Sequence, residues 1–316
     1  CRFEGDHAVV LARRTGENQF ECTAPPSVVI GESTVSVSLN GQQFSESSVT
    51  FTYEEAIIVS SIWPIRGVSE GGTPVTLLGS GFMTTRHQPL QCSFNGTTVA
   101  AIHVGEVSAI CNATPSLPPG QVLVEVTANG QDHTSSGMRF EVVSTGLNSI
   151  TPWSGPVSGR TLVTITTTFL PDAVECHFQH GIADQASVRA SIHSSESVQC
   201  LSPSNLPKGW SALQLQSYGV PIRSTLTFYF HARIEVSKIT PAAGPVAGGT
   251  RVAIAGSGLP EAASAYCRFY TTQVTIARRV NEHQVECISP ASYGEGTRTV
   301  EISMNGQQFS ESAVTF

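Results

Sequence analysis

The segment ITPAAGPVAGGTRVAIAGSGL, from Ile239 to Leu259, decides the fold, because two looser copies of it lie upstream. The copies are SIWPIRGVSEGGTPVTLLGSGF, from Ser61 to Phe82, and SITPWSGPVSGRTLVTITTTF, from Ser149 to Phe169. Their shared isoleucines are Ile62, Ile150 and Ile239. These isoleucines are 88 and 89 positions apart. A repeat of this length is a small domain, because the repeats of solenoid proteins are shorter.

Each part of this signature has a structural interpretation. The proline ends an incoming strand, because proline removes a hydrogen-bond donor from the ladder. The glycine pair that follows indicates a turn, and the alternation of Val252 and Ile254 with small residues then predicts a new strand. A nucleotide-binding loop would need a helix after the glycines, and no helical periodicity follows. The copy from Ser149 to Phe169 carries Thr166-Thr167-Thr168 where the other copies have Gly-Ser-Gly, so its strand either runs on or ends in a different turn.

The composition of the 316-residue chain favours an all-β fold. Hydrophobic residues make up 40% and charged residues 13%, with 28 glycines and 18 prolines, which suits many short strands joined by tight turns. The net charge of −7 argues against a nucleic-acid partner, because phosphate recognition needs clustered Lys and Arg. The double-basic pairs Arg13-Arg14 and Arg278-Arg279 are interpreted as solvated. No apolar run reaches membrane-spanning length, so no direct membrane insertion is expected in this segment.

Eight cysteines fall into one pair per repeat, with a similar separation within each pair. The recurrence predicts four disulfides within domains, although 105 pairings are possible in principle. The predicted pairs are Cys1 with Cys22, Cys92 with Cys111, Cys176 with Cys200, and Cys267 with Cys287. Zinc is the rival interpretation, but no Cys-x-x-Cys pair is present and the histidines are scattered, so no metal is expected. Disulfides in turn indicate an oxidising, extracellular compartment.

The repeats predict four domains, at residues 1–53, 54–143, 144–230 and 231–316. The first is the C-terminal part of a domain, because Cys1-Arg2-Phe3 matches Cys267-Arg268-Phe269 and no opening signature precedes it. The octapeptide NGQQFSES occurs at Asn40 to Ser47 and again at Asn305 to Ser312, 265 positions later. This offset spans three domains and indicates a three-domain super-repeat. We expect the chain to be a segment of a longer polypeptide, and the near absence of linkers favours a rod.

Within each domain the same order of motifs recurs. A Cys-x-Phe strand comes first, and period-2 alternation places its cysteine and phenylalanine on the buried face. The second cysteine precedes a proline turn. A hairpin with an Asn-Gly turn then closes the domain, and three alternating apolar residues before each turn are expected to face the core. These residues are Val122, Val124 and Val126; Val35, Val37 and Leu39; and Val300, Ile302 and Met304. Domain three has Ser217-Tyr218-Gly219 in place of Asn-Gly.

Together the opening signature, the Cys-x-Phe strand, the Cys-x-x-Pro turn and the closing hairpin resemble the IPT/TIG family of immunoglobulin-like domains. The resemblance covers essentially the whole chain. It implies tandem immunoglobulin-like β-sandwiches, although the buried tryptophan of antibody domains is absent. Members of this family occur in plexin and scatter-factor receptor ectodomains, in large cell-surface repeat proteins, beside sugar-processing enzymes and in Rel-type transcription factors. The resemblance therefore implies a spacer or binding role and brings no active site.

Two N-glycosylation sequons lie in domain two, at Asn95-Gly96-Thr97 and Asn112-Ala113-Thr114. The expected extracellular location predicts a glycan on at least one of them. Catalytic motifs do not assemble, since the Gly-Ser-Gly runs sit in turns and the acidic residues are dispersed. The nearest approach to a calcium site, Glu54-Glu55, is interpreted as solvated. Trp63 and Trp153 flank the signatures and are expected to pack at domain junctions. We therefore expect no enzyme activity and no cofactor other than covalent glycans.

These features lead to three hypotheses for function. The first is a structural segment of an extracellular or cell-surface glycoprotein fibre, which self-associates or contacts neighbouring copies of the same protein. The near-identical octapeptide segments three domains apart favour it, because a periodic filament needs a repeating contact surface. The alternative is the stalk of a plexin-like receptor or adhesion ectodomain. The third treats these domains as accessory to a secreted carbohydrate-active enzyme.

Overall fold

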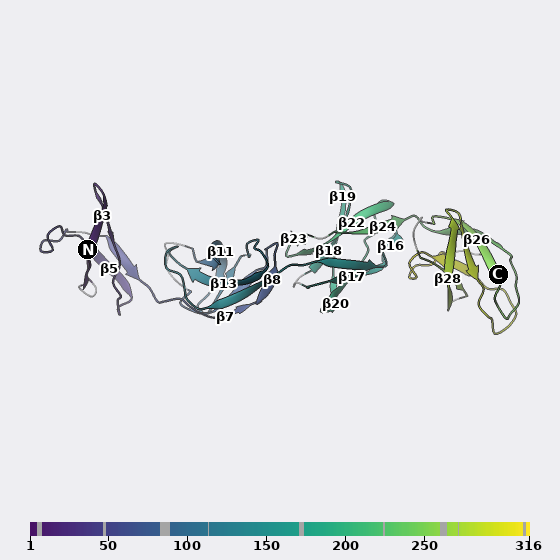
Figure 1. Cartoon of the computed structure of the whole chain (residues 1–316), viewed down its shortest axis with the longest axis horizontal. Helices are drawn as coiled ribbons and strands as arrows, with labels where there is room; N and C mark the ends of the chain where they lie inside the picture. The colour runs from purple at the N-terminus through teal and green to yellow at the C-terminus, as the bar shows by residue number, and fades with distance from the viewer. Residues whose placement is uncertain are drawn as a thin grey trace. The chain divides into compact units, whose positions relative to one another are not determined.

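A computed structural model describes residues 1–4, 8–46, 49–82, 89–112, 114–170, 174–223, 225–259, 264–270, 272–311 and 314–316. All regular structure in these residues is β-strand, and they contain no helix that could cross a membrane. The chain divides into two compact units. One holds residues 1–66, 74–115 and 121–141, and the other holds residues 67–73, 116–120 and 142–316. Figure 1 shows the strands of each domain.

Domain two is a sandwich whose sheets share one strand. The strand order is β7-β9-β12-β11-β10-β13-β14-β8. Strand β11 (Thr97–Val104) pairs with β10 (Gln91–Phe94) through its first half and with β12 (Ser108–Cys111) through its second half. A register shift between Ala101 and His103 marks the crossing. The remaining strands are β7 (Ile58–Trp63), β8 (Arg66–Val68), β9 (Val75–Ser80), β13 (Gly120–Thr127) and β14 (Met138–Val143).

Domain three has two separate sheets. The strand that corresponds to β11 of domain two is interrupted at Ala190, so its two halves belong to different sheets. Strands β15 (Leu147–Thr151), β17 (Leu162–Thr167), β21 (Ser197–Leu201) and β20 (Ser191–Ser194) follow one another in the first sheet. The second sheet has the order β16 (Ser154–Pro156), β24 (Leu226–His231), β22 (Gly209–Ser217), β18 (Val174–His180) and β19 (Asp184–Arg189), with β23 (Val220–Pro221) paired to β22. Strand β16 runs parallel to β24, so the signature contributes to both sheets.

Domain four repeats the shared-strand arrangement of domain two. Its order is β25 (Glu235–Thr240), β26 (Arg251–Ser257), β29 (Gln284–Ile288), β28 (Gln273–Asn281), β27 (Ala265–Phe269) and β30 (Val300–Ser303). Strand β28 pairs with β27 through Ala277 and with β29 from Arg278 onward. The glycine turn before β26 requires left-handed backbone at Gly248 and Gly249, with φ of 75° and 82°.

Domain one contains a sheet of order β2 (Ala8–Val9), β1 (Arg2–Phe3), β5 (Gly31–Ser36) and β6 (Thr50–Tyr53), and a hairpin of β3 (Ala12–Gly16) and β4 (Gln19–Cys22). The inward-facing prediction is wrong for Leu39, which is 88% exposed, whereas its counterpart Met304 is 2% exposed. Met304 belongs to a core that includes Ile239, Val252 and Ile254 of the opening signature, and residues 1–53 hold no copy of that segment.

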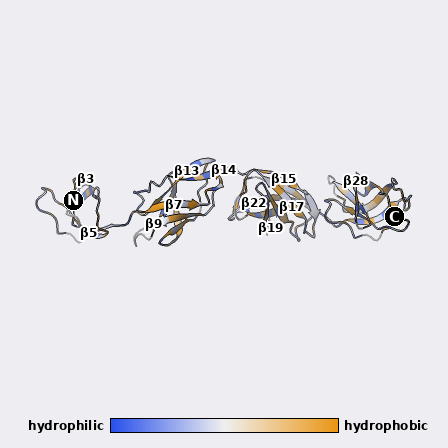
Figure 2. Ribbon diagram, turned by 90° about the horizontal axis from the view of Figure 1, so that it is seen from below, coloured by the Kyte–Doolittle hydropathy of each residue, from blue (hydrophilic) through white to orange (hydrophobic). Residues whose placement is uncertain are grey.

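The cores of domains three and four are built as alternation predicts. Cys176 and Phe178 in domain three, and Cys267 and Phe269 in domain four, are buried. Phe178 meets Phe228 and Phe230 edge-to-face at 5.7 and 5.9 Å. Val122, Val124 and Val126 of domain two, and Val300, Ile302 and Met304 of domain four, are buried as expected. Figure 2 shows hydrophobic residues concentrated on strands such as β7 and β17.

Two local predictions need correction or refinement. In domain three, β17 has 6 residues, as β9 does, so the threonines build a different turn and do not lengthen the strand. The closing segments Asn40-Gly41, Asn129-Gly130 and Asn305-Gly306 do not form two-residue hairpin turns, because only the glycine of each has positive φ. They form wider loops in which the asparagine side chain accepts backbone N–H groups. Ser47 and Ser312, at the ends of the repeated octapeptide, lie outside the described residues.

Candidate functional site

The Asn305–Gln308 loop of domain four, the NGQQ loop, is held in shape by its own side chains. Asn305 Oδ1 accepts the N–H groups of Gln307 and Gln308 at 2.9 and 3.1 Å. Ser303 Oγ accepts the N–H of Gly306 at 2.9 Å. Such Asx and Ser turns fix the backbone locally. Both glutamine side chains are therefore presented on a preformed loop.

This loop binds the start of strand β17 in domain three. Gln307 Oε1 accepts the Leu162 N–H at 2.8 Å, and Gln307 Nε2 donates to the Leu162 carbonyl at 2.8 Å. Gln308 Nε2 donates to the Arg160 carbonyl at 3.0 Å. Thr161 Oγ1 donates to Gln308 Oε1 at 2.9 Å, and Asn305 Nδ2 donates to the Ser154 carbonyl at 3.3 Å. Two glutamine side chains thus bind the backbone of another domain, much as an added strand would.

The segment that binds the NGQQ loop, Arg160–Leu162, is called the receiving segment. Its pairing with β21 leaves some of its backbone N–H and carbonyl groups open to the loop. Thr161 uses its own N–H and carbonyl on Ser202, at 3.0 and 2.8 Å, on the β21 side. The peptide groups of adjacent residues in a strand point in opposite directions. The N–H and carbonyl of Leu162 therefore point away from β21. Strand β15 reaches only as far as the pairing of Thr151 with Thr164, so Leu162 lies beyond it and is open to Gln307.

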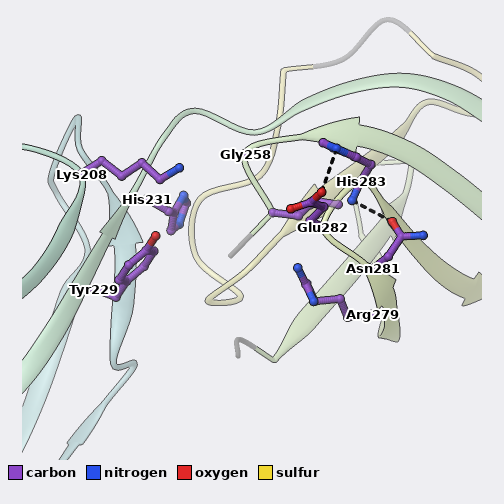
Figure 3. Close-up of a pocket in the computed structure, with 9 residues that line it drawn as sticks. Lys208, Tyr229, His231, Gly258, Arg279, Asn281, Glu282 and His283 are labelled. Carbon is purple, nitrogen blue, oxygen red and sulfur yellow. Dashed lines mark hydrogen bonds and ion pairs between the residues drawn. The ribbon is translucent and has the colours of Figure 1, made fainter. Parts of the chain in front are cut away.

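A cavity of about 530 Å³ lies beside the same two domains. Lys208, Tyr229 and His231 come from the domain-three side, where His231 is the last residue of β24, and Arg279, Asn281 and His283 are among the residues facing them from domain four, as Figure 3 shows. Asn281 Oδ1 accepts the His283 N–H at 2.8 Å, and His283 Nε2 lies 3.4 Å from Glu282 Oε1. The lining is largely polar and includes the cations Lys208 and Arg279, and its residues form no arrangement of nucleophile and base.

His231 is the buried titratable group of this cavity. Desolvation lowers the pKa of His231 from the usual 6.5, and the bond to the Ala232 carbonyl acts in the opposite direction. His231 Nδ1 donates to that carbonyl at 2.8 Å. With the proton on Nδ1, the neutral ring presents Nε2 as an acceptor. Among the described residues, neither His231 Nε2 nor Arg279 Nε has a hydrogen-bond partner.

The eight cysteines are joined in the four pairs that the repetition predicts. Their Cα–Cα distances are 6.3, 5.8, 6.5 and 6.3 Å, within the range that disulfides span. Cys92 on β10 is bonded to Cys111 on β12, and Cys176 on β18 to Cys200 on β21. Each of these bonds links one face of a sandwich to the other. No cluster of potential metal ligands occurs in the described ranges.

The two predicted glycosylation sites differ in their surroundings. Asn95 and Thr97 are both exposed, and Asn95 lies in the turn between β10 and β11. Asn112 is exposed and directly follows Cys111, but its acceptor threonine, Thr114, is only 5% exposed. Ala113 of this sequon lies outside the described residues. Asn95 is therefore the more open of the two sites.

The other residues singled out in the sequence take different positions. Trp63 is 64% exposed, so domain packing is the wrong interpretation for it, whereas Trp153 stacks on Trp210 at 5.7 Å within domain three. Arg13, Arg14 and Arg278 are exposed as expected. The solvated interpretation is wrong for Arg279, which is half-buried and lines the cavity.

The glutamines of the NGQQ loop are the functional residues that sequence reasoning missed. Gln307 and Gln308 contact residues roughly 145 positions earlier in the chain, and no local pattern encodes that pairing. The available signal was the repeat itself. The same octapeptide occurs in two loops three domains apart, which marks these loops in the sequence.

The family model for the IPT/TIG domain matches residues 1–53, 58–142, 147–230 and 235–316. Plexin-A3 of Rattus norvegicus is 26% identical over 251 residues, which cover 74% of this chain and 13% of the plexin. Plexin A3 of Danio rerio is 26% identical over 256 residues, with 73% and 13% covered. This chain thus spans about an eighth of the length of these relatives.

A solved structure of the full extracellular region of plexin A4 is 18% identical, with a TM-score of 0.48. It covers 88% of this chain and 26% of the plexin chain. The four matches of the family model span nearly every residue and coincide with the repeated sandwiches. The chain belongs to the IPT/TIG family and carries its domain in tandem.

Proposed function

We propose that this chain is part of the stalk of a cell-surface receptor or adhesion ectodomain, and that it acts as a non-enzymatic, glycosylated spacer outside the cell. The tandem IPT/TIG domains with a hydrogen-bonded junction between the third and fourth carry this proposal. The similarity to plexin-A3 supports it, as do four disulfides, which form in oxidising compartments. The hydrogen bonds from Gln307 and Gln308 to domain three would stiffen this junction of a spacer.

Surface labelling of intact cells tests the location. An antibody against domain four should label the native protein on unpermeabilised cells, and a membrane-impermeant biotin reagent should modify Lys208 or Lys238, the two lysines of the chain. Labelling that appears only after permeabilisation would contradict an extracellular stalk. Migration that shifts on reduction would show that the disulfides are present in the same material.

A glycoprotein fibre is the second candidate function. It is favoured by the octapeptide that recurs three domains apart, since a periodic filament needs a repeating contact surface. Electron microscopy of the native protein separates the two functions. Long filaments with an axial repeat would favour the fibre, and isolated molecules attached to membranes would favour the stalk.

A further inference from the structure

The cavity beside domains three and four, which we call the junction cavity, carries more positive than negative charge. Lys208 and Arg279 line it, and Glu282 is the one carboxylate of the described lining. Glu282 Oε1 lies 3.4 Å from His283 Nε2. Among the residues that the structure describes, neither Lys208 nor Arg279 forms an ion pair. Two cations against one carboxylate favour an anion as the ligand of this cavity.

Two polar atoms of the junction cavity are buried without a partner in the described part of the chain. They are Arg279 Nε and His231 Nε2, and the His231 side chain belongs to a residue that is only 4% exposed. Figure 3 shows His231 beside Lys208 and Tyr229 on one wall and Arg279 on the facing wall. Desolvation lowers the pKa of His231, so its ring is neutral above pH 6.5, with the Nδ1 proton donated to the Ala232 carbonyl.

The chemistry of these two atoms restricts the ligand further. His231 Nε2 is an acceptor, because the proton of the neutral ring is on Nδ1, whereas Arg279 Nε is a donor. A buried polar atom that stays unpaired is costly. A ligand that carries both a hydroxyl group and a negatively charged oxygen would satisfy the two atoms at once.

Tyr229 gives the junction cavity a rigid aromatic wall. Side chains alternate along β24, which places Tyr229 and His231 on the same face of the strand. Trp210 meets the Tyr229 ring edge-to-face at 5.1 Å, and it stacks on Trp153 at 5.7 Å. These contacts fix the Tyr229 ring in place. A ligand ring with apolar C–H faces can therefore pack on Tyr229 while its polar groups meet the cations.

We propose that the junction cavity binds an acidic sugar, a pyranose ring that carries a carboxylate. The carboxylate pairs with Lys208 and Arg279. A ring hydroxyl donates to His231 Nε2, and a C–H face of the ring packs on Tyr229. The volume of about 530 Å³ lies within the range of small-molecule sites. This binding site goes beyond the proposed stalk function and does not depend on it.

Inorganic phosphate and a neutral sugar are the competing occupants. Phosphate also carries negative oxygens and a hydroxyl group, but it fills only a small part of the cavity and has no apolar face for Tyr229. A neutral sugar has that face and the hydroxyl groups, but it leaves Lys208 and Arg279 without a counter-charge. The acidic sugar meets the charge, the two buried atoms and the aromatic wall together.

Titration of the 316-residue chain with a matched pair of ligands tests the proposal. Methyl glucuronide and methyl glucoside differ only in the carboxylate, which replaces a CH₂OH group. Calorimetry should give the glucuronide a Kd of about 1 mM or tighter. The glucoside and inorganic phosphate should each bind about tenfold more weakly or worse, because each lacks one of these interactions. No binding of the glucuronide, or equal binding of the glucoside or of phosphate, would overturn the proposal.

The two lysines of the chain locate the bound sugar. Lys208 lines the cavity, whereas Lys238 is exposed on β25 outside it. At a glucuronide concentration of about ten times Kd, acylation of Lys208 should slow by about tenfold, since the free site is depleted by that factor. Acylation of Lys238, followed by mass spectrometry in the same sample, should keep its rate. Bound glucuronide that leaves the Lys208 rate unchanged would place the sugar elsewhere and refute the site.

Two adjacent arginines of β28 supply the matched variants. Arg279 lines the cavity, whereas Arg278 is exposed and points to the opposite face of the strand. Arg279→Gln should weaken glucuronide binding by about tenfold or more, because it removes a charge-assisted hydrogen bond, and Arg278→Gln should bind like the wild type. Lys208→Gln changes an exposed residue, so it keeps the fold and should also weaken binding. Unchanged circular dichroism verifies folding. Wild-type affinity in both Arg279→Gln and Lys208→Gln, or a loss in Arg278→Gln equal to theirs, would contradict the proposal.

Discussion

Asn95 shows how a single exposed residue acquires a role from its place in a turn. It lies between β10 and β11 with its acceptor Thr97 also exposed, so both are open to the glycosylating enzyme. We expect Asn95→Gln to remove one N-glycan from the protein secreted by eukaryotic cells, measured as a fall in intact mass. Asn112→Gln should cause a smaller loss, because Thr114 is buried. An unchanged mass for Asn95→Gln would contradict the assignment.

Phe178 is the residue on which the core of domain three depends. It is fully buried against Phe228 and Phe230, so Phe178→Ala should lower the free energy of unfolding by about 3–5 kcal/mol. Urea unfolding followed by the fluorescence of Trp153 and Trp210, with Trp63 replaced by Phe in both proteins, reports on this domain. Ile182→Ala is the matched control, since Ile182 is 96% exposed and its loss should change stability by less than about 0.5 kcal/mol.

His231 should make the folded state sensitive to acid. Its pKa lies below 6.5 when folded and returns to about 6.5 when unfolded, so between these values the unfolded state binds more protons. The contribution of His231 to the free energy of unfolding should be fully present above pH 6.5 and be lost as the pH falls through the folded pKa. Denaturant titrations of wild type and His231→Phe across this pH range check it. The two proteins should differ in pH dependence only below pH 6.5, and equal slopes throughout would contradict the role of His231.

At the scale of elements, the NGQQ loop fixes the junction of domains three and four. Gln307→Ala removes both hydrogen bonds to Leu162, each worth about 1 kcal/mol. Hydrogen exchange at the Leu162 N–H should accelerate by about fivefold or more, because about 1 kcal/mol corresponds to that factor. Gln42→Ala is the control, since it makes the same change in domain one and should leave Leu162 protected. Equal protection in Gln307→Ala would show that Gln308 alone holds the junction.

The elements differ in how far the sequence could predict them. Local patterns identified the Cys-x-Phe strands and the cysteine pairs, because alternation and recurrence within one domain determine both. Leu39 was misplaced because its counterpart Met304 is buried against an opening signature, and no copy of that segment lies within residues 1–53. The crossing of β11 between sheets rests on a register shift at Ala101, which no residue type marks. The contacts of Gln307 could not be predicted from the sequence, because they join segments from different domains and no local pattern marks the pairing.

At the scale of the whole molecule, the domains should unfold separately. Domains three and four have distinct cores, each with its own disulfide. Calorimetry should therefore show more than one transition, since a single cooperative unit requires a shared core. Phe178→Ala should shift one transition and leave the others in place. One transition with equal calorimetric and van't Hoff enthalpies would contradict independent domains.

The Gln307 contact also bears on solubility. The peptide group of Leu162 is a short stretch of open sheet edge, and such edges invite pairing with other chains and aggregation. Each domain treats the same position differently. Domain two has Pro74, which cannot donate to an added strand, and domain three has Leu162 covered by Gln307. Domain four has Arg251, whose charge disfavours direct pairing of this sheet edge with another edge. The residue after the threonine of each opening signature thus determines how a domain limits pairing at its sheet edge: by a missing N–H, by a cover from the next domain, or by a charge.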